Sequence, residues 1–147
     1  MQLKLLVAVL ITSSEYHTGQ SPTAELIRTS SPTYLNLRAN NALCETYAQD
    51  MGTFGSRVQI KQEKPMNAST DMGNVSHLVP SFHGGFIIPA GPEISAHNPG
   101  FAACAGTEEA HQAALTCAKG MAMLALRILV DDDLAQRAKV DFEKRDE

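Results

Sequence analysis

The pattern that most restricts how this chain can fold lies between residues 107 and 130. Gly106 and Thr107 stand where a helix can begin, and Glu108 and Glu109 follow in what would be its first turn. Beyond them apolar residues recur in steps of four and three on one face: Ala110, Ala114, Cys117, Met121, Leu124 and Ile128. The pattern predicts one long helix whose many alanines let a neighbouring element approach closely.

Two shorter helices are also predicted. Asn40 or Asn41 can cap a helix that runs to about Thr53. Its apolar face steps by four residues: Leu43, Tyr47 and Met51. Three aspartates at 131–133 can cap a last, charged helix that carries Leu134, Ala138 and Phe142.

Strand character is confined to short stretches, at residues 5–11, 34–37, 57–61 and 86–88. The apolar run Leu5 to Ile11 suits a buried strand or the apolar core of a signal peptide, and it is too short to span a bilayer. Residues 1–30 form a poorly specified N-terminal segment, and residues 31–147 form the main domain. The sequence thus contains candidate helices and short candidate strands.

Composition excludes several functions. The net charge is −4 and the basic residues are dispersed, which argues against a nucleic-acid surface. Cys44, Cys104 and Cys117 are odd in number and lack C-x-x-C spacing, so neither a disulfide framework nor a thiolate zinc site is expected. We expect a cytoplasmic protein, with Cys104 and Cys117 as small apolar fillers.

The motif that points to function runs from Ser69 through Thr70, Asp71, Met72, Gly73 and Asn74 to Pro80. Its hydroxyl and carboxylate groups can accept hydrogen bonds from the start of a short helix, with Asp71 as the cap, and Gly73 permits a close backbone approach. Asn74 could bind a substrate carboxylate or stabilise the turn. A loop rich in Gly and Pro follows and carries His97, which is either a zinc ligand or an ordinary loop histidine.

In this order, the motifs resemble those of aminoacylase and carboxypeptidase-type zinc metallopeptidases (peptidase family M-twenty). The nearest branch is that of β-alanyl-lysine dipeptidase and aminobenzoyl-glutamate hydrolase. The resemblance covers roughly residues 30 to 147 and implies the C-terminal part of a three-layer α/β catalytic domain, with a short mixed sheet and helices. The implied reaction is hydrolysis of an amide bond next to a free carboxylate, on a dipeptide or acyl-amino acid.

The resemblance also implies a site that this chain matches only in part. The family holds two zinc ions on five ligands, with a Glu as general base. Of the ligands only His97 has a matching position, and Asp71 and Asn74 match the loop that faces the substrate. The first 68 residues contain no His-x-Asp pair and no suitable Glu-Glu, and there is no room for the family's lid domain. We therefore expect a truncated product that is inactive by itself.

Other chemistries are less well supported. Glu108-x-x-His111 matches one half of a di-iron pattern, and no second pair exists. His83-Gly84-Gly85 is similar to an oxyanion-hole loop, but no G-x-S-x-G motif accompanies it, so His83 is expected at a pocket edge or buried. The alternative to the hydrolase is a non-catalytic α/β interaction module derived from the same fold.

Three structural and biochemical expectations follow. The chain alone should show no zinc-dependent dipeptidase activity. His97 and the Ser69–Asn74 loop should lie together at one end of a small sheet. Part of the apolar surface of the 107–130 helix should be uncovered, which favours association into a homo-oligomer. No membrane partner is expected.

Overall fold

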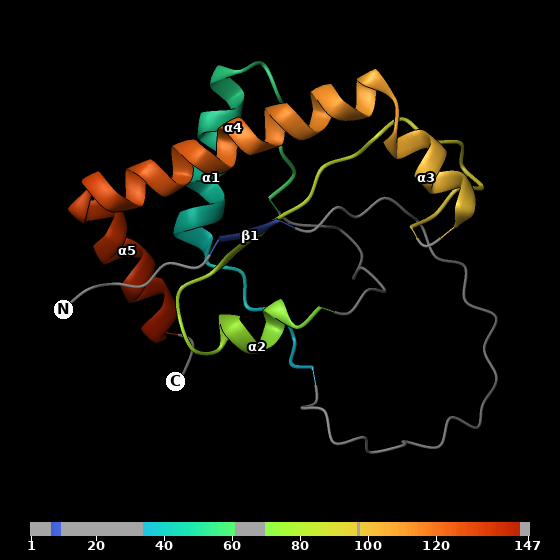
Figure 1. The fold of residues 1–147 in the computed structure, drawn as a ribbon. Coiled ribbons are helices and arrows are strands. Elements are labelled where there is room, and N and C mark those ends of the chain that lie inside the picture. Colours follow the sequence, from blue (N-terminus) through green and yellow to red (C-terminus); the bar gives the residue numbers. More distant parts are fainter. Residues whose placement is uncertain (1–6, 10–33, 61–69, 97, 145–147) are drawn as a thin grey trace, which may run out of the picture.

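The computed structural model describes residues 7–9, 34–60, 70–96 and 98–144. Over these ranges the chain is mostly helical. In chain order the elements are β1 (Val7–Val9), α1 (Asn41–Thr53), α2 (Met72–Ser76), β2 (Phe82–Gly84), α3 (Pro99–Ala105), α4 (Glu108–Val130) and α5 (Asp132–Glu143). Figure 1 shows α4 running across α1, with α5 turning back beneath the C-terminal end of α4.

The three predicted helices, α1, α4 and α5, are confirmed, and each begins at a polar cap with extended backbone. In each cap a side chain accepts a hydrogen bond from a first-turn amide: Asn40 from Leu43, Thr107 from Ala110, and Asp131 from Leu134. Such a cap satisfies an N–H group that the helix leaves free and contributes about 1 kcal/mol. Local sequence therefore determines where these helices begin.

The sheet is smaller than predicted. β1 and β2 pair in parallel, with Val7 opposite Phe82 and Val9 opposite Gly84. The strand prediction for residues 5–11 is confirmed at 7–9, and its other residues lie outside the described ranges. The strands predicted at 34–37, 57–61 and 86–88 are wrong over their described residues, because a strand needs a partner for its backbone groups and none pairs with these residues in the described part. Residue 61 lies outside the described ranges. The three-layer α/β architecture is therefore not confirmed.

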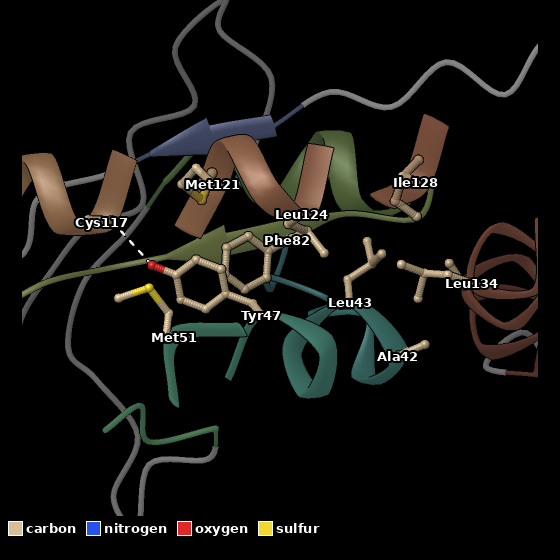
Figure 2. Close-up of a cluster of buried hydrophobic side chains, with 11 residues drawn as sticks. Ala42, Leu43, Tyr47, Met51, Phe82, Cys117, Met121, Leu124, Ile128 and Leu134 are labelled. Atoms are coloured by element: carbon tan, nitrogen blue, oxygen red, sulfur yellow. Dashed lines mark hydrogen bonds between the residues drawn. The ribbon is translucent and has the colours of Figure 1, made fainter. Parts of the chain in front are cut away.

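The core lies where α1, α4 and α5 meet, and Phe82 of β2 packs among the side chains of α1 and α4 (Figure 2). Leu43, Leu124 and Leu134, one from each helix, are fully buried. Burial of each side chain contributes about 1.5–3 kcal/mol. The Tyr47 and Phe82 rings pack with centroids 4.6 Å apart. The helical periodicity therefore identified most residues of the core. It missed Ala42 and Phe82, and it also indicated Ala114 and Phe142, which are only partly buried.

Cys117 fills space in this core, as predicted, and it also accepts a hydrogen bond. The Tyr47 hydroxyl donates to its Sγ over 3.4 Å (Figure 2). Burial, together with this contact, raises the pKa of Tyr47 well above its ordinary value. The phenol is therefore neutral and acts as a hydrogen-bond donor within the core.

Polar contacts tie the same three helices together. The Asp50 carboxylate of α1 is 1% exposed and receives Arg127 of α4 at both oxygens, each over 2.8 Å. Asn40 Nδ2 donates to the carbonyl of Ala138 in α5 over 2.8 Å. These bonds pair groups that would be costly to bury alone, so they restrict how the helices can pack.

The prediction that part of the apolar face of α4 is uncovered is wrong for that face, and the exposed apolar side chains of α4 lie on its other side. The predicted face packs against α1 and α5, while Leu126 and Leu129 on the other side are 60% and 78% exposed. Among the described helices, α4 is long and apolar enough to cross a membrane. That is weak evidence for a membrane span, because a core helix meets the same criterion.

Candidate functional site

The loop predicted to face the substrate forms α2 and its first turn. Thr70 Oγ1 accepts a hydrogen bond from the Met72 amide over 3.2 Å. Asp71 precedes the helix, has helical backbone angles and makes no capping bond. The prediction that Asp71 caps the helix is wrong, because a capping residue needs extended backbone to turn its side chain towards the free amides. Its carboxylate is exposed instead.

Three side chains around α2 bind the backbone of an extended segment, residues 34–38. Asn74 Oδ1 accepts from the Leu35 amide over 3.1 Å, and Ser76 Oγ accepts from the Arg38 amide over 2.9 Å. His77 Nε2 donates to the Asn36 carbonyl over 3.0 Å. We call this set of bonds the α2 contact. It shows Asn74 in a structural role, while its role in binding substrate stays a prediction.

Gly73 makes the α2 contact sterically feasible. A Cβ atom at this position would overlap the carbonyl oxygen of Leu35. The residue is buried, and the Ser76 hydroxyl donates to its carbonyl over 2.6 Å. The prediction that Gly73 allows a close backbone approach is confirmed, and the approaching backbone belongs to the chain itself.

His83 on β2 lies close enough to Asp71, which precedes α2, to feel its charge. Burial lowers the pKa of the His83 imidazole below its ordinary value, and the negative charge of Asp71 partly opposes that shift. His83 Nδ1 is buried and has no hydrogen-bond partner among the described residues. The prediction of a pocket-edge or buried histidine agrees with a half-buried ring on β2. Its electrostatic link to Asp71 was not predicted, and no sequence spacing signals it.

The zinc centre that the motifs imply needs several ligand side chains close together. No group of three or more His, Cys, Asp or Glu side chains comes together within the described ranges. Asp71 and His83 supply two groups at most, and His97 lies outside those ranges. The described residues therefore do not fit a two-zinc centre, and the ligand role of His97 stays a prediction.

The region after His97 contains a helix that was expected to be loop. Asn98 Oδ1 accepts from the Gly100 amide over 2.8 Å, and Pro99 occupies the first position of α3. The pair Asn-Pro is a helix-start signal that could have revealed it. Figure 1 shows α3 well separated from α2. The predicted proximity of His97 to the Ser69–Asn74 loop involves residues outside the described ranges and stays a prediction.

The other histidine motif is on the surface. Glu108 and His111 are both exposed in the first turns of α4, and the Glu108 carboxylate accepts from Gln112 Nε2 over 2.7 Å. This agrees with a helix N-terminus that carries surface charge, and not with a metal site inside a helical bundle.

No family model matches the chain. Two relatives do. The Xaa-Arg dipeptidase of Mus musculus is 31% identical over 112 residues, which make up 74% of this chain and 25% of the relative. The Xaa-Arg dipeptidase of Homo sapiens is 32% identical over 112 residues, with the same shares. The chain is a distant relative of dipeptidases. It spans about a quarter of the length of these relatives.

This relationship supports a dipeptidase-like hydrolase family. It does not distinguish the M-twenty branch, and it does not test the zinc chemistry that the motifs imply.

Proposed function

We propose that this chain forms part of an amidohydrolase of the dipeptidase type, which cleaves an amide bond next to a free carboxylate. The observation that carries the proposal is the 31–32% identity to Xaa-Arg dipeptidases over 112 residues. The ordered motifs from Ser69 to Thr107 support the same reaction class. On the basis of these motifs, the proposed family is that of the aminoacylase and carboxypeptidase-type enzymes, family M-twenty.

Within such an enzyme, α2 is proposed to border the substrate. Asp71 is exposed and makes no capping bond, so its carboxylate can receive a cationic group such as a substrate guanidinium. The relatives are named for dipeptides that contain arginine, which has this group. Asn74 and Ser76 act behind Asp71, because their bonds to residues 35 and 38 hold α2 in position.

His97 is proposed as the residue that this chain contributes to a zinc centre, whose other ligands and general base lie outside the 147 residues. The support is the position of His97 between the Ser69 motif and the helix that begins after Thr107. Because the described residues do not fit the complete centre, no catalytic step is assigned to the metal.

The second candidate is a non-catalytic interaction module, and a specific observation favours it. α1, α4 and α5 enclose a core with fully buried leucines and paired polar groups. A core of this kind can fold without the rest of a larger enzyme.

The full transcript from this locus tests which candidate holds. The hydrolase proposal expects sequence outside the 147 residues that encodes a His-x-Asp pair and an adjacent Glu-Glu pair. A transcript that encodes neither would contradict it and favour the module.

Two variants of the longest protein that the transcript encodes test the role of His97 as a zinc ligand. Hydrolysis of an Xaa-Arg dipeptide should be stopped by a chelator and restored by zinc. His97→Ala should abolish the activity, because a catalytic zinc needs each of its few protein ligands. His111→Ala is the matched control, since His111 is exposed on α4, and it should leave the activity unchanged. Full activity of His97→Ala would refute the assigned ligand role.

A further inference from the structure

We draw no further inference here: the strongest candidate, the pair formed by the half-buried His83 on β2 and the exposed Asp71 that precedes α2, rests only on the lowered pKa of His83, and nothing among the described residues shows which ligand the two side chains would bind.

Discussion

Two regions of this molecule are held together by different means. The core of α1, α4 and α5 is closed by apolar side chains that recur along each helix, with Leu43, Leu124 and Leu134 fully buried. The α2 contact is closed by hydrogen bonds from side chains to an extended segment 38 to 41 residues away in sequence. The stability of the core should therefore be most sensitive to a loss of side-chain volume. The α2 contact should be most sensitive to the addition or removal of single atoms.

The largest effect is expected in the core. Leu124→Ala should lower the free energy of unfolding by about 2–5 kcal/mol, because it removes buried contacts and leaves a cavity. Leu126→Ala is the matched control two residues along the same helix, with a side chain that is 60% exposed. It should change stability by less than about 1 kcal/mol. Urea unfolding measures both, and equal losses would show that α4 is not oriented as described.

The ion pair that links α1 to α4 should have the next largest effect. Arg127→Ala leaves the Asp50 carboxylate buried and unpaired, which should cost about 1–3 kcal/mol in urea unfolding. Lys119→Ala removes a positive charge from an exposed position of the same helix and should be nearly neutral. A neutral Arg127→Ala would mean that water reaches Asp50.

A change at one atom should open the α2 contact. Gly73→Ala places a Cβ against the Leu35 carbonyl, so residues 34–38 must move away. Overpacking of this kind costs about 1–3 kcal/mol, and here part of it should be local. The Leu35 and Arg38 amides should lose protection in hydrogen exchange. Gly52→Ala in α1 meets nothing within 4 Å and should leave that protection unchanged. Unchanged protection in both variants would show that the α2 contact does not depend on single atoms.

The smallest effect concerns His83 and pH. Burial lowers the folded-state pKa of this imidazole, while the unfolded value stays at about 6.5. As pH falls through about 6.5, the unfolded chain takes up the proton more readily, so stability falls. Above that pH both states are neutral at this position. His83→Gln should reduce the loss of stability between about pH 7 and pH 5, whereas His111→Gln, at an exposed position, should not. An unchanged pH profile would contradict the burial of His83.

Sequence predicted the core better than the site. The helix at 108–130 combines a Thr cap with a periodic apolar face, and both signals act over a few neighbouring residues. The α2 contact has no such signal. Asn74 and Ser76 bind backbone amides at residues 35 and 38, and a backbone amide is the same in nearly every residue type. The polar motif was therefore recognised, but its partners were not.

Strand predictions failed for a related reason. Polar and apolar residues alternate at 34–37 and 57–60, as is typical of a half-buried strand. Strands form, however, only where another strand supplies hydrogen-bond partners. Residues 34–38 obtain theirs from side chains around α2 instead. By contrast, Val7–Val9 became a strand because it meets Phe82–Gly84 in parallel register.

Hydrolysis of an Xaa-Arg dipeptide by the purified 147-residue chain, with zinc added, tests the central claim most directly. The claim is that this chain is related to dipeptidases but supplies a single ligand of their proposed zinc centre. It predicts no turnover above that of zinc alone, because one ligand cannot hold a catalytic metal against water. Turnover that a chelator abolishes and zinc restores would contradict the claim and would place a complete metal site within these residues.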